Sequence, residues 1–136
     1  MAETNRDVVI GIDSSTTATK AIAWTREGGV AGVGRGPIPL MSPERDRYEQ
    51  DARDWWRSTA KALGELLEQV APERVAALAI SNQRETFVPL GATGEAVRPA
   101  IVWLDQRCDQ EVDWLAGKVG RERIHQISGK PPDMAP

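Results

Sequence analysis

A carboxylate, four consecutive hydroxyl side chains and a lysine lie close together near the N-terminus, in the stretch GIDSSTTATKAIAW. Asp13 closes the apolar run VVIGID, and Lys20 follows the hydroxyls. Backbone N–H groups of a tight turn bind anions, and a lysine adds a point charge. A carboxylate such as Asp13 suits Mg²⁺, usually through retained waters. Two interpretations stay open: a phosphate site with a metal ion, or an ordinary hairpin with an Asx turn. The hydroxyl residues are Ser14, Ser15, Thr16 and Thr17.

A second polar group, SNQRET, directly follows the apolar run VAALAI. Ligands of open α/β sheets collect outside the carboxyl ends of the strands. Gln83, Arg84 and Glu85 offer an amide, a guanidinium and a carboxylate, which together suit a neutral polyhydroxyl compound. Trp103, at the end of PAIVW, could cover the C–H face of a sugar. The alternatives are a solvated loop with an incidental Arg–Glu pair and a tryptophan that belongs to the core.

Composition excludes several classes of protein. Of the 136 residues, 40% are hydrophobic and 27% charged, which is typical of a globular domain. The net charge of -3 and the scattered basic residues predict no nucleic-acid partner. No apolar stretch is long enough for a membrane span or a secretory signal, so we expect a cytoplasmic protein without a membrane partner. Cys108 and His125 are single, which excludes an internal disulfide and a His/Cys metal cage.

Hydrophobic periodicity predicts an α/β domain. Runs at 8–13, 18–24 and 30–36 indicate three antiparallel strands joined by hairpins. The period then changes to that of a helix, capped by Asp51, and a further strand at 75–81 returns parallel after the helical crossover. Both the first and the last of these strands are expected to be covered on both faces. The expected buried stripe of the helix is Trp56, Ala60, Leu63, Leu67 and Val70.

Two further features complete the expected organisation. A second helix is predicted after Asp105, which would cap it, with an apolar stripe at Val112, Leu115 and Val119. GVGRGP has three close glycines but lacks G-x-G-x-x-G spacing and runs into Pro37, so it is neither a Rossmann fingerprint nor a P-loop.

The order and spacing of these segments resemble the FGGY carbohydrate kinases. GIDSSTTATKA is similar to the family's N-terminal phosphate motif, YEQDARDWW to its helix-entry motif, and SNQRET with RPAIVW to its substrate segment. The resemblance implies a ribonuclease H-like (actin-like ATPase) fold, with ATP and Mg²⁺ in a cleft between two domains. It places Asp13 near Mg²⁺, and Thr16, Thr17 and Lys20 at the ATP phosphates. The implied substrate contacts are Gln83, Arg84, Glu85 and Trp103.

The resemblance leaves the substrate open. NQRET is close to glycerol kinases, whereas YEQDARDWW and WLDQRC are more similar to xylulokinases. Glycerol kinases carry a substrate-binding Tyr after a Thr-Gly element, and SGKPPDMAP has none. The family usually has a glycine at the position of Ser15. We therefore expect a sugar, ketose or polyol as substrate without choosing among them.

Family members are much longer, and the resemblance makes residues 1–136 the N-terminal part of the first kinase domain. The general base, an Asp, would lie beyond Pro136, together with the remaining kinase domain. A homodimer of the full-length form is compatible with this interpretation. Two rivals are a non-catalytic actin-like nucleotide-binding module and an inactive truncated remnant. We expect the chain alone to be inactive; ATP-dependent phosphorylation of any polyol by it would contradict this.

Overall fold

The computed structural model describes residues 6–133 of the chain, which form two compact units. Of the described residues, unit 1 comprises 6–40 and Asp51–Gln83, and unit 2 comprises Met41–Gln50 and 84–133. Each unit is described by itself below.

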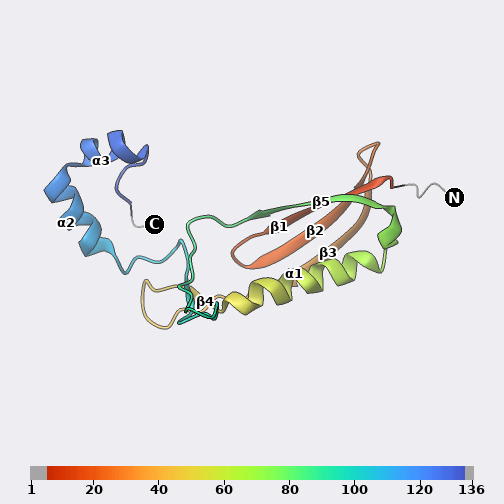
Figure 1. Cartoon of the computed structure of the whole chain (residues 1–136), viewed down its shortest axis with the longest axis horizontal. Coiled ribbons are helices and arrows are strands. Elements are labelled where there is room, and N and C mark those ends of the chain that lie inside the picture. The colour runs from red at the N-terminus through yellow and green to blue at the C-terminus, as the bar shows by residue number, and fades with distance from the viewer. Residues whose placement is uncertain (1–5, 134–136) are drawn as a thin grey trace. The chain divides into compact units, whose positions relative to one another are not determined.

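Unit 1 is a mixed four-stranded sheet in the order β3-β2-β1-β5 (Figure 1). The antiparallel strands and the parallel return predicted from the sequence are confirmed: β1 pairs antiparallel with β2, β2 with β3, and β5 lies parallel to β1. The chain reaches β5 through helix α1 and a short 3-10 turn, η1. The bounds are β1 Val8–Ser14, β2 Ala18–Thr25, β3 Val30–Pro37, α1 Ala52–Leu67, η1 Pro72–Arg74 and β5 Val75–Asn82.

Helix α1 begins as predicted, with Asp51 as its N-cap accepting a hydrogen bond from the backbone N–H of Arg53 at 2.9 Å. It packs on β2 and β3 at unusually short range. A methyl group at Gly34 would lie 1.9 Å from the carbonyl oxygen of Ala62, and one at Gly36 would lie 2.1 Å from that of Ser58. The glycines of GVGRGP therefore serve helix packing, because only hydrogen atoms fit between the two backbones.

The predicted buried stripe of this helix is wrong in most of its members. Trp56 is 72% exposed, whereas Ser58, Ala62 and Leu66 are buried. Where α1 comes closest to the glycines of β3, only small helix residues fit. Ser58 and Ala62 therefore face β3, in place of the larger residues of the predicted stripe. The Ser58 hydroxyl donates to the Gly36 carbonyl at 2.7 Å, which satisfies a buried polar group.

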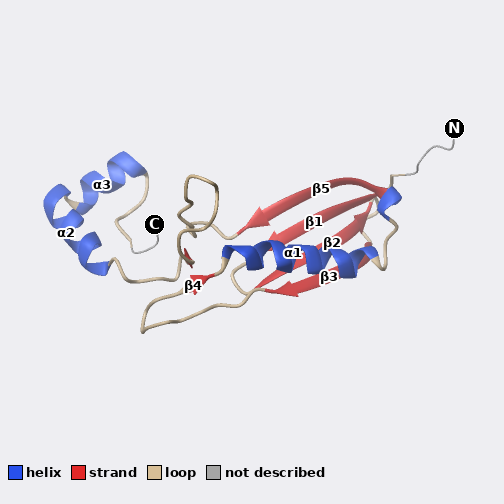
Figure 2. Cartoon of the chain, turned by 60° about the horizontal axis from the view of Figure 1, so that its bottom comes forward, coloured by secondary structure: helices blue, strands red, loops and turns tan. Residues whose placement is uncertain are grey.

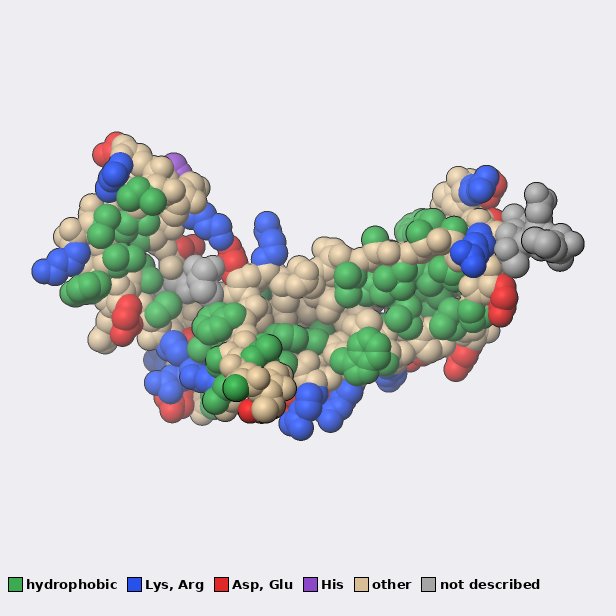
Figure 3. All heavy atoms as spheres, in the orientation of Figure 1, with side chains coloured by type: hydrophobic (Ala, Val, Ile, Leu, Met, Phe, Trp, Pro, Cys, Tyr) green, Lys and Arg blue, Asp and Glu red, His purple; other side chains and the backbone are tan. Residues whose placement is uncertain are grey.

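The expectation that two strands are covered on both faces is also wrong for the described residues. Along β1, side chains alternate between buried and exposed, with Val8, Ile10 and Ile12 in the core. Helix α1 packs on β2 and β3, whereas β5 is the edge strand beyond β1 (Figure 2). On β5, Leu78 and Ile80 are 51% and 58% exposed. Figure 3 shows hydrophobic side chains gathered over the strands of unit 1.

Unit 2 has little regular sheet. Strands β4 (Glu49–Gln50) and β6 (Ala100–Ile101) pair antiparallel, and isolated bridges join Phe87 to Ile101 and Leu90 to Ala96. These bridges make the segment around GATG a hairpin, with glycines in its turn. Its buried residues include Gln50, Ala100, Val102 and Asp105.

Two helices, α2 (Asp109–Val119) and α3 (Arg121–Ser128), complete unit 2. The prediction that Asp105 caps the second helix is wrong, because α2 begins four residues later with Cys108 at its N-cap. Of the predicted stripe, Leu115 and Val119 are exposed. Within residues 6–133, no helix is both long and apolar enough to cross a membrane.

The close approach of α1 and β3 predicts that Gly34→Ala destabilises the chain. The added methyl collides with helix backbone, and such overpacking costs roughly 1–3 kcal/mol or more. Gly11→Ala is the matched control, since a methyl group there has no atom within 4 Å. Thermal unfolding checks both variants. Equal melting temperatures of the two would contradict the packing argument.

Candidate functional site

The first candidate site lies in unit 1, where β1 and β5 end side by side. The strand register pairs Asp13 with Lys20 on β2 and with Ser81 on β5. All three residues line an open hollow of about 530 Å³, together with apolar residues such as Ile22 and Trp24. The sheet thus brings a carboxylate, an ammonium group and a hydroxyl from three strands onto one surface.

The hydroxyl groups after Asp13 divide between the two faces of the sheet. Ser15 donates from its hydroxyl to Oδ2 of Asp13 at 2.8 Å, and its backbone N–H donates to the Ala18 carbonyl at 3.0 Å. Ser14 is buried and accepts a hydrogen bond from the Thr19 hydroxyl at 3.3 Å. Successive strand residues point to opposite faces, so Ser14 cannot join Asp13 in binding a ligand.

The remaining candidates are compatible with a phosphate group and a hydrated cation. Lys20 and Thr17 are exposed, and Thr16 is partly exposed. Among residues 6–133, Lys20 makes no ion pair, so its ammonium group is available to an anion. No group of three metal-ligating side chains occurs in this part of the chain. A single carboxylate, Asp13, suits Mg²⁺ that keeps its waters and shares ligand phosphates.

The second candidate site lies in unit 2. Arg84 is exposed, and Trp103 is 41% exposed. The backbone N–H of Trp103 donates to the Thr86 hydroxyl at 3.1 Å, which ties Trp103 to the segment that carries Arg84 and Glu85. The structure therefore unites three of the four predicted substrate residues in one unit. Gln83 belongs to unit 1, where its backbone N–H donates to the Ser14 carbonyl at 2.9 Å.

Glu85 has two features that the sequence did not predict. Its φ is 61°, in the left-handed region that non-glycine residues seldom adopt and that is common at functional sites. Its Oε1 forms an ion pair with Lys130, from the segment SGKPPDMAP. Residues 134–136 of that segment lie outside the described residues. Lys130 therefore lies beside Glu85, a candidate substrate-binding residue.

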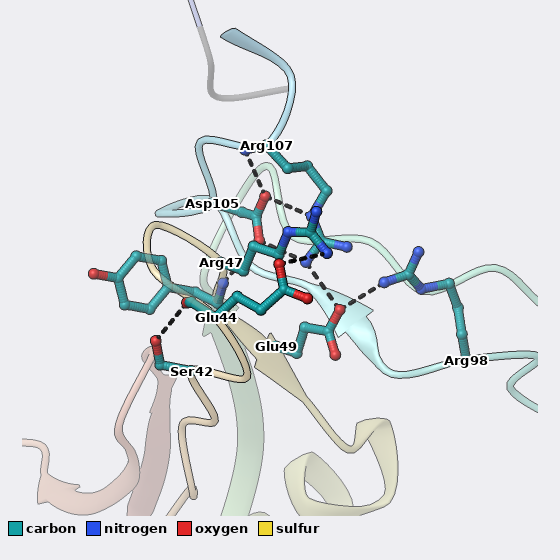
Figure 4. Close-up of polar contacts among 8 residues, drawn as sticks. Ser42, Glu44, Arg47, Glu49, Arg98, Asp105 and Arg107 are labelled. Carbon is teal, nitrogen blue, oxygen red and sulfur yellow. Dashed lines mark hydrogen bonds and ion pairs between the residues drawn. The ribbon is translucent and has the colours of Figure 1, made fainter.

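A partly buried charge network in unit 2 was not predicted from the sequence (Figure 4). Asp105 accepts hydrogen bonds from the Tyr48 backbone at 2.7 Å and from Nε of Arg107 at 2.7 Å. Arg107 also reaches Glu49 at 2.9 Å, and Glu49 pairs with Arg98 at 2.6 Å. The Asp-x-Arg spacing in WLDQRC could have indicated this ion pair, but the sequence analysis assigned Asp105 as a helix cap.

The network shifts the titration of its carboxylates. Burial raises the pKa of Asp105, but hydrogen bonds from the Arg107 side chain and the Tyr48 backbone outweigh it and lower the pKa to about 2. The pKa of Glu49 is also lowered, chiefly by the hydrogen bond from Arg107, against a smaller effect of burial. Both carboxylates therefore stay ionised well below neutral pH.

The sequence matches the N-terminal domain of the FGGY family of carbohydrate kinases over residues 8–135. A glycerol kinase of Methylorubrum extorquens (strain PA1) is 38% identical over 128 residues, which cover 92% of this chain and 26% of that protein. A glycerol kinase of Gluconobacter oxydans (strain 621H) is 37% identical, covering 91% and 25%. The chain thus spans about a quarter of the length of these curated relatives.

Solved structures of sugar kinases share the fold. The xylulose kinase of Rhodospirillum rubrum superposes with a TM-score of 0.87 at 29% identity, covering 94% of this chain and 27% of that one. The gluconate kinase of Lactobacillus acidophilus has a TM-score of 0.86 at 24% identity, covering 95% and 26%. This likeness confirms the predicted actin-like fold class.

The lowered pKa of Asp105 predicts a stability loss in acid. A carboxylate whose pKa is depressed by folding stabilises the fold above its ordinary pKa of 3.8, and this contribution disappears as the pH falls toward about 2. The free energy of unfolding should therefore fall by about 2 kcal/mol more in the unsubstituted chain than in Asp105→Asn between pH 5 and pH 2.

Urea unfolding at a series of pH values measures this difference. Asp113→Asn is the control, because Asp113 is exposed on α2 and its ion pair with Arg121 lies at the surface. It should retain the acid dependence of the unsubstituted chain. Parallel curves for the unsubstituted chain and Asp105→Asn would contradict the pKa assignment.

Proposed function

This chain belongs to the FGGY family of carbohydrate kinases, and from this premise we propose that it is the N-terminal part of the first domain of an ATP-dependent kinase. The full-length protein transfers a phosphoryl group to a hydroxyl of a sugar, ketose or polyol. Unit 1 of this chain contributes to the phosphate site, and unit 2 contributes part of the substrate site.

The observation that carries this proposal is the three-strand register at Asp13. Pairing with Lys20 and Ser81 places a carboxylate beside an ammonium group and a hydroxyl at the end of β1. Phosphoryl transfer depends mainly on positioning and on neutralising charge. Bound Mg²⁺·ATP supplies the phosphoryl group and part of that neutralisation. Asp13 would hold the hydrated ion, while Lys20, Thr16 and Thr17 would bind phosphate oxygens.

The substrate class follows from the chemistry of unit 2. The Arg84 guanidinium donates to hydroxyl oxygens, the Glu85 carboxylate accepts from hydroxyl groups, and the exposed ring of Trp103 covers C–H groups. Similarity to glycerol kinases and to a xylulose kinase supports a polyol or a ketose. Gln83, at the end of β5, is a further candidate for contact with the substrate.

The test begins with the mass of the native polypeptide in its source cells. That species is then screened for ATP consumption with glycerol, xylulose, ribulose, gluconate and pentitols. Turnover of one compound by a longer polypeptide would support the kinase and identify its substrate. A stable species of 136 residues that consumes no ATP would contradict catalysis and favour a binding module or a remnant.

Arg84→Ala should raise the KM for the substrate in the native-length protein by roughly tenfold to a hundredfold, because a charge-assisted hydrogen bond is lost. Arg123→Ala is the control, since Arg123 is an exposed arginine on α3. Steady-state kinetics measure both variants. A KM unaffected by Arg84→Ala would count against the polyol site and favour a nucleotide-dependent switch.

A further inference from the structure

We propose that Asp105, Arg107 and Glu49 are positioning residues that hold Trp103 in place for the substrate. The inference rests on the proposed function, because it takes the Trp103 ring as one wall of the polyol site. None of the three residues needs to touch the substrate. They act through the backbone of the turn that begins at Val102 and carries Trp103.

Hydrogen bonds fix the backbone on both sides of Trp103. Its own N–H donates to the Thr86 hydroxyl at 3.1 Å. The N–H of Val102 donates to the Tyr48 carbonyl at 3.0 Å, and Val102 is fully buried. The N–H of Asp105 then donates to the Val102 carbonyl at 2.8 Å, which closes the turn. The location of Trp103 therefore depends on the position of this turn.

The charged side chains fasten that turn to the segment before α1. The Asp105 side chain is only 2% exposed, and its Oδ2 accepts from the Tyr48 N–H at 2.7 Å. Its Oδ1 accepts from the N–H and Nε of Arg107 at 3.0 and 2.7 Å. Arg107 also donates to Oε1 of Glu49, the residue after Tyr48, at 2.9 Å. Two links thus connect the same two segments, one through Asp105 and one through Arg107 (Figure 4).

Trp103 is 41% exposed, so burial fixes its ring less firmly than that of a core residue, and the backbone that carries the ring contributes to its position. Buried ion pairs often contribute little net stability, because desolvating the charges is costly. The directional hydrogen bonds of such pairs do hold the connected segments in one arrangement, and a binding site needs neighbouring residues that fix its side chains in this way. The network therefore has the geometry to set the position of the turn that carries Trp103.

Fluorine NMR of the chain labelled with 5-fluorotryptophan tests this directly. Single Trp→Phe changes assign the resonances of Trp103 and of Trp24, which lies on β2 in unit 1. In Asp105→Asn we expect the Trp103 resonance to shift and broaden while the Trp24 resonance stays in place. Asp113→Asn, which breaks only an exposed pair with Arg121, should change neither resonance.

A second variant covers the case in which Asp105→Asn unfolds unit 2. Glu49→Gln removes the charge that pairs with Arg107 and with Arg98, and so weakens the link at Glu49, but leaves the bonds between Arg107 and Asp105 intact. It should also shift the Trp103 resonance, by less than Asp105→Asn. The proposal would be overturned if the Trp103 resonance does not shift in Glu49→Gln and, in addition, Asp105→Asn either leaves that resonance unshifted or unfolds.

Titration with glycerol and then xylulose separates this inference from the proposed function. If either compound moves the Trp103 resonance, Asp105→Asn should weaken its binding by roughly tenfold, because a misplaced ring loses contact with it. If neither compound moves that resonance in the native-length protein, the polyol site fails. The ligand-free spectra still decide whether the network positions Trp103.

Discussion

The architecture of unit 1 depends on the backbone contact between β3 and α1. Gly34 and Gly36 leave room for the carbonyl groups of Ala62 and Ser58, and no larger residue fits at those points. The contact places the helix along β2 and β3. After the helix, the chain adds β5 beside β1, at the edge of the sheet opposite β3. The parallel ends of β1 and β5 then meet, which is the condition for a site at Asp13.

Strand alternation decides which polar groups can serve that site. Asp13 and its register partners Lys20 and Ser81 line the hollow, whereas Ser14 is buried against Thr19. A run of four hydroxyls therefore supplies fewer ligand contacts than its composition suggests. The Ser15 hydroxyl donates a hydrogen bond to the Asp13 carboxylate and so orients that carboxylate. The arrangement fits a single acidic residue beside phosphate-bound Mg²⁺.

Unit 2 relies on charge where unit 1 relies on apolar packing. Its buried side chains include Asp105 and Gln50 beside Ala100 and Val102, which form only a small apolar core. Short strands and isolated bridges leave the turn around Trp103 with few ladder hydrogen bonds. The hydrogen-bonded ion pairs of Asp105 supply part of the missing hydrogen bonding, and the lowered pKa of Asp105 predicts that the unit loses stability in acid.

The sequence by itself determined the order of strands and α1, the N-cap at Asp51 and the position of Asp13 at a strand end. These features follow from local periodicity, capping chemistry and family motifs, which neighbouring residues encode. Only the tertiary structure decided that Trp56 faces solvent, that Ser14 is buried and that Asp105 joins a charge network. Each of these depends on a partner distant in sequence: the glycines of β3, the register of the sheet and the segment at Tyr48. A one-dimensional pattern records which residues are apolar or charged, but not which surface they will meet.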